Sequence, residues 1–119
     1  MKFFYLKTCD TCKRIMNDLD IENRAVDLRE IKSENVSPEE LDQMKKHEGS
    51  YESLFNKRAR KYREQKLNER ELSEDDFRQL ILDEYTFLKR PVLLSNDRAF
   101  AGNSKKVIAE AQQYLDSSK

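Results

Sequence analysis

The sequence has few of the residues that break, bend or cross-link a chain: two glycines, two prolines and two cysteines among 119 residues. So few glycines and prolines exclude collagen-like and linker-like chains. The two cysteines, Cys9 and Cys12, would close only a tiny loop if they formed a disulfide, so they cannot staple a secreted domain. This cysteine usage indicates a reducing compartment, and we expect the protein in the cytoplasm.

Long apolar runs are absent as well. None approaches the roughly 20 residues of a membrane-spanning helix, and the apolar stretch near Met1 is too short for a signal peptide. The single histidine, His47, stands among charged residues, whereas a structural zinc site needs four ligands. The sequence has no glycine-rich dinucleotide or phosphate loop. We therefore expect no membrane segment, no metal and no bound cofactor.

The chain has no net charge, because 23 basic residues balance 23 acidic ones. Charged residues are 39% of the sequence and hydrophobic residues 37%, a composition that favours disorder only when net charge is high. The charges balance and the apolar residues recur periodically, so we expect a single folded domain over residues 1–119. A neutral chain has no overall attraction for nucleic acid, and we predict a monomer that does not bind nucleic acid directly.

The first predicted elements are a strand, a helix and a second strand. The apolar run 3–6 is typical of a buried strand, and apolar residues then recur at helical spacing from Cys12 to Leu19. Residues 24–28 are predicted as the second strand. A strand–helix–strand unit of this kind builds a parallel pair of strands.

The middle of the chain is predicted to be helical. Residues 37–40 read Ser-Pro-Glu-Glu, a capping box with proline at the first helical position, and Gly49 is expected to end this helix. Ser73 marks the start of another helix. Its buried face is predicted to hold Phe77, Leu80, Ile81 and Tyr85.

The last part of the chain changes its period again. Residues 91–94 are predicted as a strand that begins at a proline, and 99–101 as a short return strand after a turn. A final helix is predicted to face inward with Val107, Ile108, Ala111, Tyr114 and Leu115. The complete order is that of thioredoxin. We predict an α/β, thioredoxin-like fold with a four-stranded mixed sheet and a helical insertion at about 30–87 between its halves.

Cys9 and Cys12 stand where the first predicted strand ends and the helix begins. A cysteine there meets unpaired backbone N–H groups and the positive end of the helix dipole, and both stabilise the nucleophilic thiolate. Cys12, one turn later, could attack a mixed disulfide on Cys9 and release the partner. We predict that the two form a catalytic redox pair. The alternative is that Cys12 is only a small core residue.

Two basic features accompany the cysteines. Arg90 directly precedes Pro91, and a thioredoxin-like site places a proline, often cis, opposite the reactive cysteine. Arg90 would then reach an anion at Cys9, unless it is an ordinary surface arginine. A basic stretch, residues 57–66, is either a solvated helix face, a source of an anion-binding arginine or a docking surface for an acidic partner.

These motifs together resemble the arsenate reductase–Spx family of thioredoxin-like proteins. The resemblance is carried by residues 5–14, which contain Cys9-Asp10-Thr11-Cys12, and by residues 54–58, 88–94 and 101–103. It implies that Cys9 is the catalytic cysteine. It also implies that Arg90 and Pro91 are the family's arginine and cis-proline.

The resemblance further implies that Cys12 is the second cysteine of the Spx branch, in which the pair forms a regulatory disulfide. Arg58 matches an arginine of the Spx-like branches and is expected to bind the anion together with Arg90. Near Asn56 and Gly102 the reductases carry two further oxyanion arginines that this sequence lacks. Asn56 is expected to shape the site together with Thr8 and Pro91.

Three functions follow from the resemblance. The first is a thiol-dependent reductase in which Cys9 attacks arsenate or a disulfide. Cys12, glutathione, or a glutaredoxin or thioredoxin partner then resolves the adduct. The second is an Spx-like redox-sensing regulator whose Cys9–Cys12 disulfide controls docking on the RNA polymerase alpha subunit. A family member acting on a small glutathione-linked substrate is a third. We favour the reductase, because a site chemistry is visible in the sequence and a docking motif is not.

Overall fold

The computed structural model describes residues 1–117, which fall into two compact units. The first unit combines the N-terminal segment Met1–Glu34 with the C-terminal segment that begins at Arg90, and the second is Asn35–Lys89. The sequence places a helical insertion at about 30–87. That the whole chain forms a single domain stays a prediction.

The first unit contains a four-stranded mixed sheet with the order β2-β1-β3-β4. The central strand β1 (Lys2–Tyr5) runs parallel to β2 (Asp27–Glu30) and antiparallel to β3 (Val92–Leu94). Strand β4 (Ala99–Ala101) pairs antiparallel with β3. The predicted α/β architecture with a mixed four-stranded sheet is confirmed.

The predicted position of the second strand is wrong, because β2 begins at Asp27 and not at Arg24. The Arg24 side chain is engaged elsewhere: its Nε donates to the Leu19 carbonyl at 2.8 Å and its Nη2 to Asp116 at 2.9 Å. Strand β2 also lies at the sheet edge, where Leu28 is 42% exposed. Residues 24–26 therefore lie outside the strand that the sequence predicts at 24–28.

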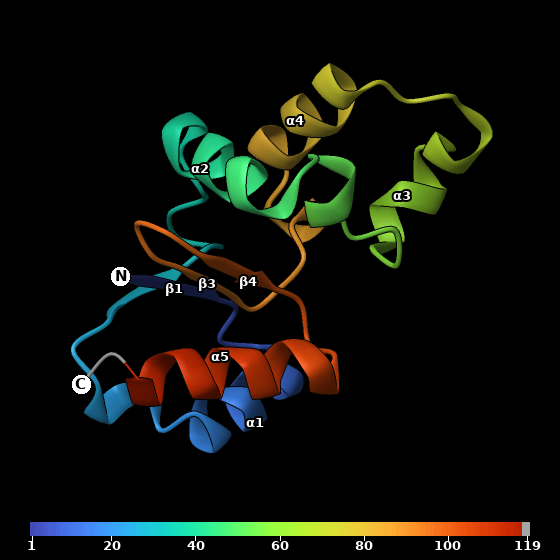
Figure 1. The fold of residues 1–119 in the computed structure, drawn as a ribbon. Helices are drawn as coiled ribbons and strands as arrows, with labels where there is room; N and C mark the ends of the chain where they lie inside the picture. The colour runs from blue at the N-terminus through green and yellow to red at the C-terminus, as the bar shows by residue number, and fades with distance from the viewer. Residues whose placement is uncertain (118–119) are drawn as a thin grey trace. The chain divides into compact units, whose positions relative to one another are not determined.

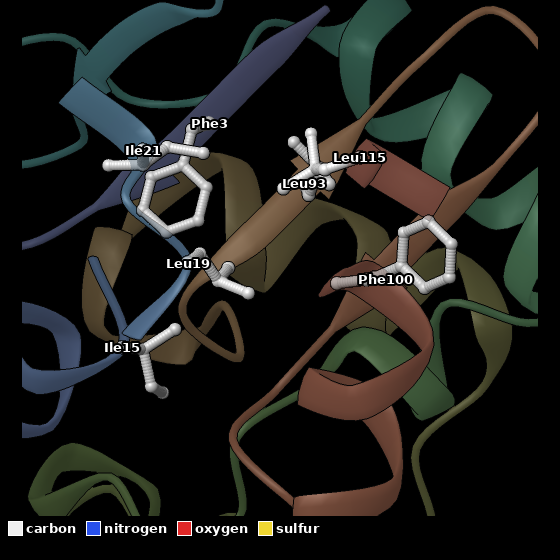
Figure 2. Packing of buried hydrophobic residues seen from close by; sticks show 8 residues of the cluster. Phe3, Ile15, Leu19, Ile21, Leu93, Phe100 and Leu115 are labelled. Atoms are coloured by element: carbon white, nitrogen blue, oxygen red, sulfur yellow. The ribbon is translucent and has the colours of Figure 1, made fainter. Parts of the chain in front are cut away.

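Helices α1 (Asp10–Asp18) and α5 (Lys105–Ser117) lie side by side against one face of the sheet (Figure 1). A hydrophobic core fills the space between these helices and the strands (Figure 2). Its buried members are Phe3, Ile15, Leu19, Ile21, Leu93, Phe100, Ala111 and Leu115. The predicted inward faces of both helices are confirmed. Removal of this apolar surface from water is the main force that holds α1, and with it the cysteine motif, against the sheet.

The second unit is built from helices and short 3-10 turns. In chain order these are α2 (Pro38–Glu48), η2 (Glu52–Leu54), α3 (Arg60–Glu64), η3 (Leu67–Glu69), α4 (Glu74–Asp83) and η4 (Tyr85–Phe87). The predicted capping box of α2 is present: the Ser37 hydroxyl accepts the Glu40 N–H at 3.1 Å, and the Glu40 carboxylate accepts the Ser37 N–H at 2.9 Å. Gly49 ends the helix with a φ of 96°, which glycine adopts without steric cost.

Helix α4 starts after Ser73, as predicted, but it does not include Tyr85. The side chain of Glu84 accepts hydrogen bonds from the N–H and hydroxyl of Thr86 at 3.2 and 3.0 Å. Such side-chain bonds compete with helix propagation, and a new 3-10 turn begins here. Tyr85 is therefore half-buried in that turn, outside the helix.

An aromatic cluster forms the centre of the second unit. The ring of Phe55 lies 5.0 Å from those of Phe77 and Phe87, and 5.6 Å from that of Tyr62, between ring centroids. Phe55 also forms a β-bridge with Leu88. The segment around Phe55 is thereby tied to the segment that leads out of this unit.

Candidate active site

Cys9 is the N-cap residue of α1 and follows the turn that ends β1. Its backbone N–H donates to the Leu6 carbonyl at 3.1 Å, and its carbonyl accepts the Lys13 N–H at 3.1 Å. These bonds set the Cys9 sulfur at the start of the helix, where backbone N–H groups have no partner within the helix.

The surroundings of Cys9 favour its thiolate. Partial burial is the largest single influence and raises the pKa of the Cys9 thiol. Two hydrogen bonds from Cys12, one from its backbone N–H and one from its thiol, lower the pKa. The charge and hydrogen bonding of the Arg90 guanidinium lower it further. Together these groups outweigh burial, so that the pKa of Cys9 lies below its ordinary value. A larger fraction of Cys9 is therefore ionised at neutral pH than of a free cysteine.

Cys12 has the opposite character. Its side chain is fully buried, and burial is the main cause that raises the pKa of its thiol to about 11. The adjacent Cys9 sulfur raises the pKa of Cys12 further. A hydrogen bond with the Leu6 backbone and the charge of Arg90 lower this pKa, but they do not offset the rise. Cys12 therefore stays protonated at pH values at which a larger fraction of Cys9 is ionised, and both cysteines are free in this structure.

Strand pairing explains how Arg90 reaches the cysteines. In the antiparallel pair of β1 and β3, Phe4 lies opposite Val92. If this register is continued past the strand ends, Arg90 comes opposite Leu6, whose carbonyl already binds the Cys9 N–H. Two segments 81 positions apart (90 − 9) in the sequence are thereby brought to one end of the central strands.

Pro91 is buried between Arg90 and β3, and the Arg90–Pro91 peptide bond is cis. The Pro91 carbonyl accepts the Gly102 N–H at 2.9 Å, next to the end of β4. The Nε atom of Arg90 is also buried. The guanidinium is therefore held by its surroundings and does not extend freely into solvent.

The turn that leads into Cys9 is bound by a residue that the sequence did not indicate. Glu30, the last residue of β2, accepts the Lys7 N–H through Oε2 at 3.0 Å. Thr8 follows in the same turn and is exposed. The Glu30 contact spans 23 positions of the sequence and depends on the register of two parallel strands, so no local pattern marks it.

Asn56 and Arg58 belong to the second unit. The Asn56 backbone N–H donates to the Phe87 carbonyl at 2.7 Å, and its Nδ2 donates to the Thr86 carbonyl at 3.3 Å. Its Oδ1 accepts the Arg58 N–H at 3.1 Å, which organises the turn that carries this exposed arginine. The participation of Arg58 in anion binding stays a prediction, as do the site-shaping roles of Asn56 and Thr8.

Part of the basic stretch is paired with acidic residues of its own unit. Lys57 forms an ion pair with Glu52 at 2.7 Å, and Lys61 forms one with Glu84. These contacts reduce the charge that the stretch presents to a partner. Within residues 1–117, no three His, Cys, Asp or Glu side chains gather in a way that would hold a metal ion. None of the helices in this range has the length and apolarity needed to cross a membrane.

A family model, that of the ArsC family, matches residues 4–111. The chain belongs to the ArsC family. The matched range includes Cys9, Cys12, Arg90 and Pro91, and the family predicted from the sequence motifs is confirmed. No curated protein matches this ArsC-family chain significantly.

Solved structures share the fold. The YffB protein is 25% identical with a TM-score of 0.79, and the match covers 93% of this chain and 97% of that one. SACOL0876 from Staphylococcus aureus COL is 27% identical with a TM-score of 0.75, with 92% and 95% covered. An arsenate reductase from Vibrio cholerae is 18% identical with a TM-score of 0.77, with 92% and 97% covered. At that identity the last likeness shows the fold alone.

Proposed function

We propose that this ArsC-family protein is a thiol-dependent reductase in which the Cys9 thiolate attacks arsenate. The observation that supports the proposal is the convergence of Arg90, the Cys12 N–H and the Cys12 thiol on the Cys9 sulfur. An oxyanion and a thiolate repel each other, so their reaction needs a cation beside the sulfur. Arg90 is that cation, and Arg58 is proposed as a second anion-binding residue.

The proposed reaction has two covalent steps. In the first, the Cys9 sulfur forms a bond to arsenic, and one arsenate oxygen leaves as water. In the second, another thiol attacks the Cys9 sulfur, so that a disulfide forms and the sulfur–arsenic bond breaks. Its electron pair stays on arsenic, which leaves as arsenite. The two electrons come from the two thiols, and a thiol reductant regenerates them.

Cys12 is the first candidate for the second thiol. Its pKa is raised mainly by burial and partly by the Cys9 sulfur, and the contribution of the sulfur is lost once Cys9 is bonded to arsenic and the sulfur is no longer a thiolate. Cys12 would then become a better nucleophile only after the first step. Glutathione, a glutaredoxin or a thioredoxin are the alternative resolving thiols.

Arsenite formation from arsenate tests the proposal, with glutathione plus glutaredoxin and with a thioredoxin system as separate reductants. We expect turnover that Cys9→Ser abolishes, and an arsenic adduct detectable by mass spectrometry that persists longer in Cys12→Ser. Arg58→Ala should raise KM for arsenate, whereas Arg60→Ala, also at an exposed arginine, should not. Turnover that survives in Cys9→Ser would refute the proposed reaction.

The presence of Cys12 beside Cys9 supports a second candidate, an Spx-like redox-sensing regulator. This function predicts that the oxidised protein, with a Cys9–Cys12 disulfide, copurifies with the RNA polymerase alpha subunit. Binding should be lost on reduction and in Cys12→Ser. Redox-dependent binding by a folded protein that does not reduce arsenate would select this function over the reductase.

A further inference from the structure

We infer that Glu30 is a positioning residue for the reactive cysteine, because its carboxylate holds the turn at residues 7–8 that sets Cys9 at the start of α1. The inference deepens the proposed function and rests on it in one respect only, that Cys9 is the reactive thiol.

The Glu30 side chain acts where the backbone ladder between β1 and β2 ends. Tyr5 and Glu30 are the last paired residues of the two parallel strands, and the Ile31 N–H donates to the Tyr5 carbonyl at 3.0 Å. A regular parallel ladder would next offer a backbone carbonyl to the Lys7 N–H. Here Glu30 Oε2 accepts that N–H instead, at 3.0 Å. The chain can therefore leave the strand and turn toward α1 without losing this hydrogen bond.

Both oxygens of the Glu30 carboxylate are engaged. While Oε2 binds Lys7, Oε1 accepts the N–H and the hydroxyl of Ser33 at 3.0 and 3.3 Å. Burial raises the pKa of Glu30, but the hydrogen bonds from Lys7 and Ser33 outweigh it and lower the pKa overall. The carboxylate is thus charged at neutral pH and cannot rotate away from Lys7 without losing its bonds to Ser33.

Two hydrogen bonds hold the turn that precedes Cys9. Leu6 binds the Cys9 N–H from within the turn, and Glu30 binds the Lys7 N–H from the neighbouring strand. If the Glu30 contact is lost, the turn can shift, and the Cys9 sulfur no longer keeps its place beside the Cys12 N–H and the Arg90 guanidinium. The pKa of Cys9 should then rise, because those two groups stabilise its thiolate.

The direction in which the pKa of Cys9 changes shows whether Glu30 acts by positioning the turn or only through its negative charge. Removal of a negative charge near a thiolate stabilises the thiolate and lowers its pKa. A loosened turn has the opposite effect. A rise in the pKa of Cys9 after removal of Glu30 therefore cannot come from the lost charge.

The experiment measures the alkylation rate of Cys9 against pH, with the modified residue mapped by mass spectrometry. We expect Glu30→Ala to raise the apparent pKa of Cys9 by roughly half a unit, which lowers the thiolate fraction about threefold at a pH below that pKa. Glu30→Gln keeps an amide oxygen that can accept the Lys7 N–H, and its Cys9 pKa should stay at or below that of the unmodified protein. Glu34→Ala is the matched control, because Glu34 lies on the same segment, is 74% exposed and pairs only loosely with Arg29 at 3.6 Å.

An unchanged or lowered pKa of Cys9 in Glu30→Ala overturns the inference, and so does an equal rise in Glu34→Ala. If Glu30→Ala does not fold, Glu30→Asp decides the question, since it keeps the charge but withdraws the oxygens from Lys7. A rise there supports positioning, and no change overturns it. An unmodified protein whose Cys9 has the pKa of a free thiol would instead contradict the proposed function.

Discussion

Cys9 and Cys12 lie one helical turn apart in α1, yet their thiols have opposite acidities. Cys9 is half-buried and its pKa is lowered, whereas Cys12 is fully buried and its pKa is raised to about 11. The Cys12 thiol donates a hydrogen bond to the Cys9 sulfur, so the protonated state of one stabilises the ionised state of the other. This relationship supports the proposal that Cys9 makes the first nucleophilic attack.

The first prediction concerns selective alkylation. At neutral pH, iodoacetamide should modify Cys9 and leave Cys12 unmodified, because Cys9 is partly exposed and its pKa is lowered, whereas Cys12 is buried and its pKa is raised to about 11. The rate should rise with pH through a midpoint below the roughly 8.5 of a free cysteine. Mass mapping of the modified peptides checks this, and unfolded protein, in which both cysteines should react, is the control. Equal rates at both cysteines of the folded protein would contradict the assignment.

The second prediction concerns Arg90. Arg90→Ala removes both the charge and the hydrogen bonding that this side chain directs at Cys9, so the pKa of Cys9 should rise by roughly one unit or more. The pH dependence of Cys9 alkylation measures the shift. Arg14→Ala is the matched control, since Arg14 is an exposed arginine of α1. A comparable shift in both variants would mean that general positive charge, and not the placement of Arg90, stabilises the thiolate.

The sequence predicts those features that depend on local patterns. The strand–helix junction places Cys9 at the helix start, and the apolar stripe places Ile15 and Leu19 in the core. The capping box at Ser37 determines the first turn of α2 through contacts three residues apart. Each of these features depends on residues that are close together in the chain, so a local sequence pattern is enough to predict it.

Features that depend on distant contacts were misplaced or missed. The sequence predicts Arg24 in a strand. Its side chain instead bonds to Asp116, 92 positions away, and no local pattern reveals that contact. Glu30 showed no functional signal because its acceptor role arises only when β1 and β2 pair in register. Tyr85 is predicted to lie in a helix for a different reason: the competing side-chain bonds between Glu84 and Thr86 are local, but they depend on the rotamer that Glu84 adopts.

The third prediction concerns the core of the first unit. Leu93 is 2% exposed within the cluster beneath α1 and α5, so Leu93→Ala should lower the free energy of unfolding by about 2–5 kcal/mol. Leu28→Ala is the matched control, because Leu28 is 42% exposed at the sheet edge and its truncation should cost less than about 0.5 kcal/mol. Urea denaturation measures both values. Similar losses in the two variants would mean that the core does not lie where the structure has it.

The fourth prediction concerns acid stability of the second unit. Hydrogen bonds from Arg78 and Tyr51 lower the pKa of Asp42 and link α2 to α4. A carboxyl group whose pKa is lower in the folded state stabilises the fold above its unfolded pKa of roughly 3.9, and this contribution is lost as pH falls through the folded pKa. Asp42→Asn should therefore be less stable than the unmodified protein at neutral pH.

The difference between Asp42→Asn and the unmodified protein should shrink as pH falls below about 4, because both then lack the charge at this position. Urea denaturation at a series of pH values measures it. Glu64→Gln, which removes an exposed carboxylate from α3, is the control and should leave the pH dependence nearly unchanged. A stability difference for Asp42→Asn that is constant across pH would show that the amide disturbs packing, and that the Asp42 charge does not stabilise the contact between α2 and α4.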